Sequence, residues 1–298
     1  MTDAAGQVGV IAGWGRYPRV VLEALRERGL RTCCLGIRDH AEAHLAEVAD
    51  EFHWIGLAQI GGAIRRFRRR GITEATLAGK VHKVVLFQPR AFWRHRPDWR
   101  TIRTFYPHFL STSKDRNDDT LLTAVVDAFA ASGIRMNPAT DYAPQLLAQE
   151  GCLTRRAPTA SQEKDIDFGW HLAKQMGRLD IGQCVAVKDR AVLAVEAIEG
   201  TDECIRRAGA LCTSGGFTIV KVAKPQQDMR FDVPTIGLGT LENIAAAGGR
   251  VLAIEAGRTI IVDRPRMIEF ADRFKLVIVA RRDRSAPPPA LAQPLEAL

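Results

Sequence analysis

Residues 9–18, Gly-Val-Ile-Ala-Gly-Trp-Gly-Arg-Tyr-Pro, decide the fold of the first half of the chain. A short β-rich run ends in Gly13-Trp14-Gly15, and the apolar residues after Pro18 recur at helical spacing. The pattern predicts a strand, a glycine turn and a helix. Such a turn lets backbone N–H groups approach a phosphate at the helix N-terminus, where the dipole favours negative charge. A tight turn with no ligand is the alternative.

The alternation of strand and helix continues beyond this turn. Residues 32–37 and 74–79 are β-rich, residues around Ile64 and Phe67 have helical spacing, and residues 118–131 predict a further helix. Alternating elements of this kind are typical of a parallel sheet with crossover helices. We therefore predict an α/β fold whose Rossmann-like, nucleotide-binding domain spans residues 1–145. Because Pro18 stands where a dinucleotide fingerprint has glycine or alanine, the turn favours a phosphate or nucleotide without specificity for NAD.

A second domain is predicted beyond the prolines and glycine that interrupt residues 138–158. We expect a mixed α/β catalytic domain over residues 146–284 and a disordered, proline-containing tail over 285–298. The expected helices are 162–176, 202–208 and 240–247, the last capped by Thr240; the expected strands are 183–187, 192–196, 218–222, 251–254, 259–262 and 275–279.

Composition restricts the class of protein. The 298 residues carry a net charge of +8, which favours anionic partners: nucleic acid, acidic lipid or a phosphorylated metabolite. Apolar runs stay far below the roughly 20 residues needed to cross a bilayer, and the N-terminus lacks a secretory signal, so we expect a cytoplasmic protein. The six cysteines form no C-x-x-C pair and no zinc-type spacing, so they are expected to be reduced core residues.

Residues 228–237, Asp-Met-Arg-Phe-Asp-Val-Pro-Thr-Ile-Gly, hold the most informative acidic pair. In an extended segment, Asp228, Arg230 and Asp232 would share one side and the apolar residues the other. Two carboxylates beside a guanidinium suit a phosphate and its divalent ion. An exposed edge strand that neutralises its own charges is the alternative interpretation.

Two features near this segment carry compatible chemistry. Gly200-Thr201-Asp202 is a second glycine turn before a predicted helix, where Thr201 would cap the helix and Gly200 would admit a phosphate oxygen. Plain capping explains Thr201 equally well. Lys221 and Lys224 precede the acidic pair and would clamp phosphate oxygens.

Aromatic and basic residues alternate between Phe87 and Phe109. The pattern suits stacked bases or the headgroup zone of an anionic membrane. Arginines around buried aromatics on a surface helix are the alternative. A separate arginine cluster at residues 65–70 is expected to lie on a solvated helix face.

Four stretches together resemble the two-domain UDP-2,3-diacylglucosamine pyrophosphatases of lipid A biosynthesis. They are the glycine turn at 9–18, Gly-Arg-Leu-Asp-Ile-Gly-Gln at 177–183, Val-Glu-Ala-Ile-Glu-Gly-Thr-Asp at 195–202, and the acidic segment at 228–237. The resemblance covers roughly residues 8–282 and is carried by the last three stretches in their order. Trp14 departs from it, because the family usually has glycine there.

The resemblance implies hydrolysis of UDP-2,3-diacylglucosamine to 2,3-diacylglucosamine 1-phosphate and UMP, with the substrate between two domains and Mg²⁺ or another divalent cation as cofactor. It implies that Asp232 is catalytic. Asp232 and Asp228 are the expected metal ligands. The expected substrate-binding residues are Gly13, Gly15, Lys80, Gln183, Glu196, Gly200, Thr201, Asp202, Lys221, Lys224 and Arg230.

The partners follow from that substrate. We expect a lipid-linked UDP sugar, peripheral contact with the inner leaflet of the cytoplasmic membrane, no nucleic acid and, by analogy with the family, a homodimer. Two other functions remain open on the residues alone. One is an NAD(P)-dependent oxidoreductase built on the first glycine turn, and the other is a non-catalytic nucleic-acid-binding protein that uses the aromatic and basic segment.

Overall fold

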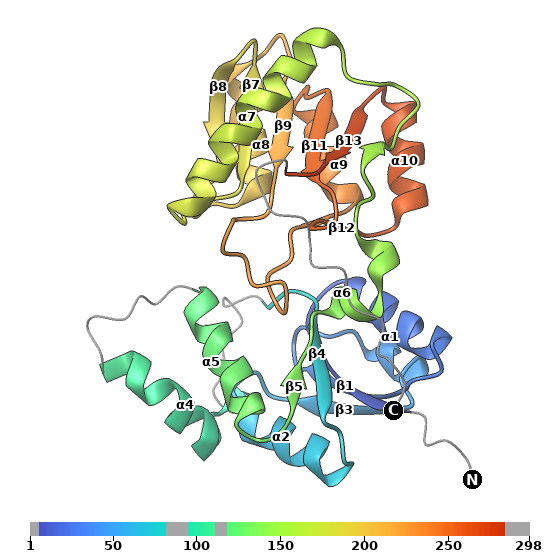
Figure 1. Cartoon of the computed structure of the whole chain (residues 1–298), viewed down its shortest axis with the longest axis vertical. Helices are drawn as coiled ribbons and strands as arrows, with labels where there is room; N and C mark the ends of the chain where they lie inside the picture. Colours follow the sequence, from blue (N-terminus) through green and yellow to red (C-terminus); the bar gives the residue numbers. More distant parts are fainter. Residues whose placement is uncertain (1–5, 82–94, 111–117, 284–298) are drawn as a thin grey trace, which may run out of the picture. The chain divides into compact units, whose positions relative to one another are not determined.

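The computed structural model describes residues 6–81, 95–110 and 118–283 (Figure 1). The chain forms two compact units. The N-terminal unit takes in the residues up to Leu147 together with Gln226–Val233, and the C-terminal unit takes in Ala148–Pro225 and the residues from Pro234 onward. Residues 228–233 of the acidic segment therefore belong to the N-terminal unit, although the residues before and after them in the sequence belong to the C-terminal unit.

The N-terminal unit is built on a parallel five-stranded sheet of order β3-β2-β1-β4-β5. The strands are β1 (Gln7–Ala12), β2 (Arg31–Ile37), β3 (Glu51–Ile55), β4 (Glu74–Ala78) and β5 (Arg135–Met136). The helices are α1 (Tyr17–Glu27), η1 (Ala43–Glu47), α2 (Ile60–Arg69), α4 (Trp99–Leu110), α5 (Asp118–Ala130), α6 (Ala139–Tyr142) and η3 (Pro144–Leu146).

Two hydrophobic cores hold this unit together, one on each face of the sheet. Leu22 and Leu25 of α1 pack into one core, and Phe67 of α2 and Phe129 of α5 pack into the other. Helices on both faces of a parallel sheet confirm the predicted Rossmann-like architecture. Strand β3 was not predicted, because it lies at the sheet edge and its residues are only half-buried, which leaves no continuous apolar run.

The C-terminal unit contains a mixed six-stranded sheet of order β6-β13-β11-β9-β7-β8. Its strands are β6 (Gly151–Cys152), β7 (Cys184–Lys188), β8 (Ala191–Val195), β9 (Thr218–Lys221), β11 (Val251–Glu255) and β13 (Val277–Arg281), and β10 (Thr235–Ile236) pairs separately with β12 (Ile260–Ile261). The helices are α7 (Ala160–Arg178), α8 (Thr201–Leu211), α9 (Leu238–Ala246) and α10 (Arg264–Arg273).

Helix α7 packs on one face of this sheet and the remaining three helices pack on the other. The mixed α/β fold is thus as predicted, with several local corrections. Helix α10 was missed because only Met267 and Ala271 on it are buried. Thr240 lies inside α9, which begins after Gly237, and Cys152 is exposed while the other five cysteines are buried.

Asp98 ties the beginnings of two helices in the N-terminal unit together. Its Oδ1 accepts hydrogen bonds from the backbone N–H and hydroxyl of Thr101, both at 2.9 Å, and its Oδ2 accepts the N–H of Gly62 at 2.7 Å. Burial alone would raise the pKa of Asp98, but these hydrogen bonds outweigh it and hold that pKa below its ordinary value. One carboxylate therefore caps both α4 and α2.

We expect Asp98→Ala to lower the free energy of unfolding by roughly 2–3 kcal/mol, since a single lost cap costs about 1 kcal/mol. A carboxyl whose folded pKa is depressed stabilises above its unfolded pKa of about 4 and loses that contribution as pH falls through the folded value. The difference between wild type and variant should therefore shrink in urea titrations below about pH 4. Thr159→Ala, which removes the cap of α7 alone, is the matched comparison and should cost about half as much.

Candidate functional site

The predicted residues of the C-terminal unit meet at one edge of its sheet. Strands β9 and β11 are parallel, and β7 runs antiparallel to both β9 and β8. The carboxyl ends of β8, β9 and β11 therefore lie beside the amino end of β7. Gln183, Glu196, Lys221 and Glu255 stand at these ends, the position at which α/β sheets commonly bind ligands.

Glu196 joins the starts of β7 and α8. Its carboxylate is buried, accepts the hydroxyl of Thr201 at 2.8 Å and accepts the backbone N–H of Gln183 at 3.3 Å. Thr201 consequently does not cap α8 as predicted, because its hydroxyl is directed to Glu196. Gly200 is the N-cap instead, with φ of 85°, a left-handed conformation that glycine adopts without strain.

Lys221 is a buried cation at the end of β9, with 8% of its surface exposed. Its Nζ donates a long hydrogen bond of 3.4 Å to the carbonyl of Thr235, and no carboxylate of the described residues lies within ion-pairing distance. The buried Oε1 of Gln183 has no hydrogen-bond partner within the described part of the chain. A buried ammonium without a counter-ion is costly, so this edge is suited to an anionic ligand.

Two glycines in the stretch 177–183, which precedes β7, allow its backbone to pack closely against neighbouring residues. A Cβ on Gly177 would lie 3.2 Å from the Cα of Lys224, and a Cβ on Gly182 would lie 2.1 Å from the carbonyl oxygen of Glu196. Between them Asp180 has φ of 55° and forms an ion pair of 2.5 Å with Lys224. The close backbone approach therefore places Lys224 and Glu196, both predicted binding residues, against this turn.

A buried ion-pair network, which was not predicted from the sequence, holds the backbone at the same end of the sheet. Lys174 Nζ contacts Glu255 Oε2 at 2.7 Å and Asp283 at 3.1 Å. Glu255 accepts the N–H of Ala223 at 2.8 Å, and Lys174 donates to the carbonyl of Ala223 at 3.1 Å. Both backbone groups of the residue before Lys224 are thus fixed. Two features of the sequence could have indicated this network: Lys174 lies on the buried face of α7, and Glu255 ends an apolar strand.

In the N-terminal unit, the glycine turn is closed by its own backbone. The N–H of Gly13 donates to Ala78 at 2.8 Å, and Trp14 exchanges two hydrogen bonds with Lys80, at 2.8 and 3.0 Å. The N–H of Gly13, which we expected to approach a phosphate, is therefore already engaged, as is the N–H of Trp14. Gly15 has φ of 98° and open space where a Cβ would lie.

The acidic segment is a turn and not the predicted extended strand. The carbonyl of Asp228 accepts the N–H of Asp232 at 3.0 Å, and its Oδ1 accepts the N–H of Arg230 at 3.0 Å. These local bonds bend the chain, since aspartate side chains commonly compete with strand pairing in this way. Phe231 is partly buried against the core that contains Phe67, so the turn is anchored by its aromatic side chain.

The two aspartates of this turn are in different environments. Both oxygens of Asp228 bind the guanidinium of Arg230, and that hydrogen bonding lowers the pKa of the Asp228 carboxyl. Asp232 instead accepts a hydrogen bond from the amide of Gln227. The described residues contain no group of three or more carboxylate, histidine or cysteine ligands that could hold a metal. A single carboxylate together with phosphate oxygens is still a common way to bind Mg²⁺.

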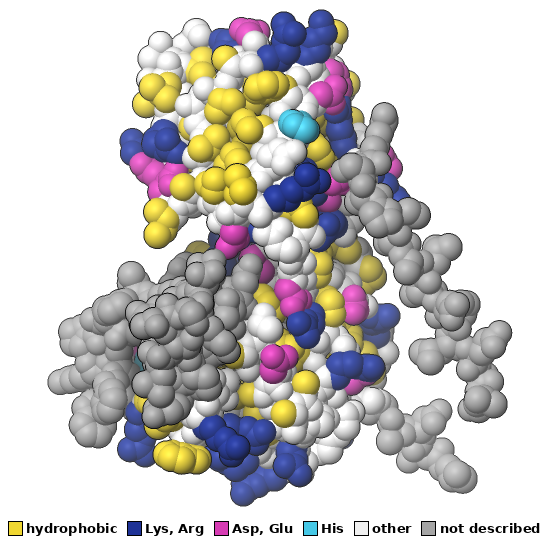
Figure 2. All heavy atoms as spheres, turned by 60° about the vertical axis from the view of Figure 1, so that its left-hand side comes forward, with side chains coloured by type: hydrophobic (Ala, Val, Ile, Leu, Met, Phe, Trp, Pro, Cys, Tyr) yellow, Lys and Arg dark blue, Asp and Glu magenta, His cyan; other side chains and the backbone are white. Residues whose placement is uncertain are grey.

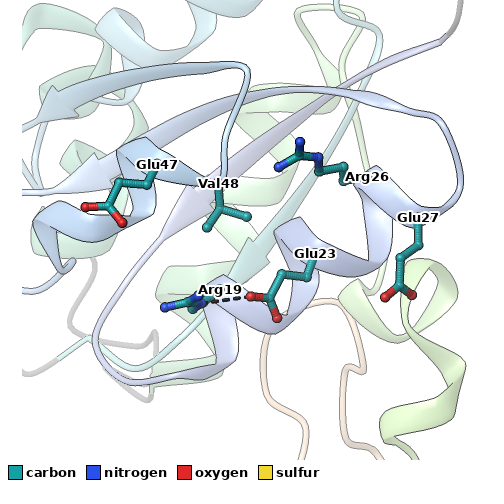
Figure 3. A pocket seen from close by; sticks show the side chains of 6 residues that line it. All are labelled: Arg19, Glu23, Arg26, Glu27, Glu47 and Val48. Atoms are coloured by element: carbon teal, nitrogen blue, oxygen red, sulfur yellow. Dashed lines mark hydrogen bonds and ion pairs between the residues drawn. The ribbon is translucent and has the colours of Figure 1, made fainter.

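Two surface hollows contain few of the predicted site residues. A hollow of about 460 Å³ in the N-terminal unit is lined by residues of α1 and η1, with Arg19 paired to Glu23 (Figure 3). It contains no predicted site residue. A second hollow between α8 and α9 is lined by Asp202, which is exposed there beside Glu199 and Glu203.

Residues 87–94 of the segment from Phe87 to Phe109 lie outside the described residues. Phe87, Arg90, Phe92, Trp93 and Arg94 are among those outside, as is the tail 285–298. On the described start of α4, Trp99 and Ile102 are exposed, by 78% and 43%, and Thr101 is buried. We find no helix in the described residues with the length and apolar character to cross a bilayer.

Fold and site define a two-domain α/β protein whose C-terminal unit presents lysines, carboxylates and an amide at one sheet edge, a class suited to phosphorylated ligands. Residues 7–146 match the model of the LpxI N-terminal domain, and residues 149–279 match that of the LpxI C-terminal domain. The chain therefore belongs to the LpxI family, which confirms the resemblance carried by the four motifs.

A curated relative extends over nearly the whole chain. The UDP-2,3-diacylglucosamine pyrophosphatase LpxI of Caulobacter vibrioides is 31% identical over 282 residues, which cover 92% of this chain and 96% of that protein. Among solved structures, the biotin carboxylase subunit of pyruvate carboxylase is similar to 70% of this chain and 33% of its own, at 11% identity and a TM-score of 0.26.

Proposed function

We infer that this protein hydrolyses the pyrophosphate bond of UDP-2,3-diacylglucosamine, releasing UMP and 2,3-diacylglucosamine 1-phosphate in lipid A biosynthesis. The observation that carries this inference is the match of both LpxI domain models together with a relative of that activity over 92% of the chain. The oxidoreductase alternative has less support, because both domain models and the relative that covers 92% of the chain belong to the LpxI family.

Charge neutralisation is the chemical requirement of this reaction. The oxygens of a pyrophosphate gain negative charge as the bridging bond breaks, and fixed cations stabilise that charge. Lys221, buried and without an ion-pair partner in the described residues, is our first candidate for a phosphate oxygen. Lys224 would bind a second oxygen by exchanging its pair with Asp180. Glu196 and Thr201 hold Gln183 and α8 in place beside Lys221.

We propose that a divalent cation such as Mg²⁺ is the cofactor and that Asp232 is its protein ligand. When bound, such an ion polarises phosphoryl oxygens and lowers the pKa of a coordinated water. Because Arg230 occupies both oxygens of Asp228, we assign Asp228 to orienting Arg230, and Arg230 to binding a phosphate oxygen. Gln227, itself buried, orients the carboxylate of Asp232.

We propose that the protein works in the cytoplasm and contacts the inner membrane peripherally. Trp99 and Ile102, one turn apart on α4, offer apolar surface, and Leu179 and Ile181 on either side of Asp180 are 72% and 47% exposed. Figure 2 shows many apolar side chains on one face of the C-terminal unit. The net charge of +8 favours anionic headgroups. We propose no nucleic-acid partner, and a homodimer stays a prediction.

The test is direct. Purified protein given UDP-2,3-diacylglucosamine and Mg²⁺ should release UMP, measured by chromatography together with the lipid 1-phosphate. Removal of divalent ions with EDTA should abolish release, and restored Mg²⁺ should recover it. Wild-type protein that leaves the substrate intact in Mg²⁺, Mn²⁺ and Co²⁺ would contradict the proposed function, and full activity in EDTA would contradict the cofactor.

A further inference from the structure

Trp14 is a half-exposed aromatic residue at the place where a Rossmann-like sheet commonly binds its ligand. In the order β3-β2-β1-β4-β5, the chain proceeds outward from β1 in one direction and from β4 in the other. Crevices at such a switch point, outside the carboxyl ends of the strands, receive ligands. Trp14 follows the carboxyl end of β1, faces Lys80 after β4 and is 52% exposed.

The backbone of Trp14 is held rigidly. Its N–H and its carbonyl both bond to Lys80, at 2.8 and 3.0 Å. The strand ends approach so closely that a Cβ on Gly13 would lie 2.5 Å from the carbonyl oxygen of Lys80, and a Cβ on Gly79 would lie 2.8 Å from Pro18 Cγ. An aromatic side chain on a fixed backbone loses little conformational entropy when it binds a flat ligand.

We propose that the indole of Trp14 is a stacking platform for the uracil ring of the UDP moiety, with Lys80 beside it for a phosphate. The identity of the base rests on the proposed function. Because the N–H groups of Gly13 and Trp14 are engaged with Ala78 and Lys80, Trp14 would contact a ligand through its side chain. An aromatic face serves a nucleobase well, since stacking on a side chain contributes about 1–3 kcal/mol per base.

A membrane contact is the other use of an exposed tryptophan, because indoles are enriched at headgroup level. The observations favour the nucleobase. Trp14 stands in a tight turn between two strand ends, whereas Trp99 stands on an outer helix with Ile102 beside it. Stacking of a base requires a rigidly held aromatic ring, and the hydrogen bonds between Trp14 and Lys80 hold the Trp14 backbone at the ends of β1 and β4.

The experiment measures UMP binding by calorimetry for wild type, Trp14→Leu and Trp14→Phe. Trp14→Leu should weaken UMP binding about tenfold and raise KM for UDP-2,3-diacylglucosamine similarly, with kcat within about twofold. Trp14→Phe retains a stacking ring and should stay within about threefold of wild type. Trp54→Leu, which removes a partly exposed tryptophan of β3 in the same sheet, is the matched control and should bind UMP normally.

Three outcomes would contradict the stacking proposal or the proposed function. Unchanged UMP affinity in Trp14→Leu, or no UMP binding by wild type at millimolar concentration, overturns the stacking proposal. Loss of binding to phosphatidylglycerol vesicles with unchanged UMP affinity would assign the indole to the membrane and also overturn it. Failure of the proposed function is distinguishable, because wild type would then bind UMP through Trp14 yet leave UDP-2,3-diacylglucosamine intact.

Discussion

Asp232→Ala is expected to lower kcat for UDP-2,3-diacylglucosamine roughly 10²–10³-fold, the usual cost of removing one group that stabilises developing charge. Arg230 binds both oxygens of Asp228, whereas the carboxylate of Asp232 accepts a hydrogen bond from the side-chain amide of Gln227. Its loss should remove the proposed ligand of the divalent ion. The fold should survive, because Phe231 anchors the turn to the core and its side chain is retained.

Two further variants test whether the negative charge of Asp232 is what matters. Asp232→Asn keeps an oxygen for the Gln227 amide and loses only the negative charge, so it should be nearly as inactive as alanine and should require more Mg²⁺. Asp167→Asn, which changes a largely exposed carboxylate of α7, should retain activity. An Asp232→Asn enzyme with wild-type kcat and wild-type Mg²⁺ dependence would rule out a role for the charge.

Most of the fold was predictable because its signals are local. Apolar strand runs and helical spacing mark β1, α1, α2 and α7, and glycines mark the turns between them. Elements whose stability depends on their neighbours were not predictable. β3 is held by pairing with β2 through half-buried residues, and the polar helix α10 buries only Met267 and Ala271.

The candidate site was predictable in residue type and less so in geometry. The motif 177–183 supplied Gln183 as a predicted binding residue, whereas Asp180 of the same motif was not predicted. The contacts of Asp180 with Lys224 and of Gln183 with Glu196 depend on long-range packing around Gly177 and Gly182. An alternating pattern at 228–233 indicated a strand, yet the Asp228 side chain bonds locally and turns the chain. Local hydrogen bonding of this kind leaves no mark on hydrophobic periodicity.

Lys174→Met is expected to lower the free energy of unfolding by about 3–5 kcal/mol, because it leaves Glu255 buried without its cation. Glu255 is 1% exposed, and among the described residues its carboxylate would retain the N–H of Ala223 and the more distant Arg258, at 3.9 Å. Urea unfolding at pH 7 would measure the change. Glu255→Gln should cost less, because its amide oxygen can still accept the Ala223 N–H.

The double variant Lys174→Met/Glu255→Leu separates stability from positioning. Replacing both buried charges with apolar groups often restores stability, so it should unfold at higher urea concentration than Lys174→Met alone. It still lacks both side-chain hydrogen bonds to Ala223, and Lys224 should no longer be held in place. We therefore expect kcat/KM to stay at least about tenfold below wild type, in line with the sensitivity of catalysis to misplaced groups. Activity that recovers together with stability would show that the network serves the fold alone.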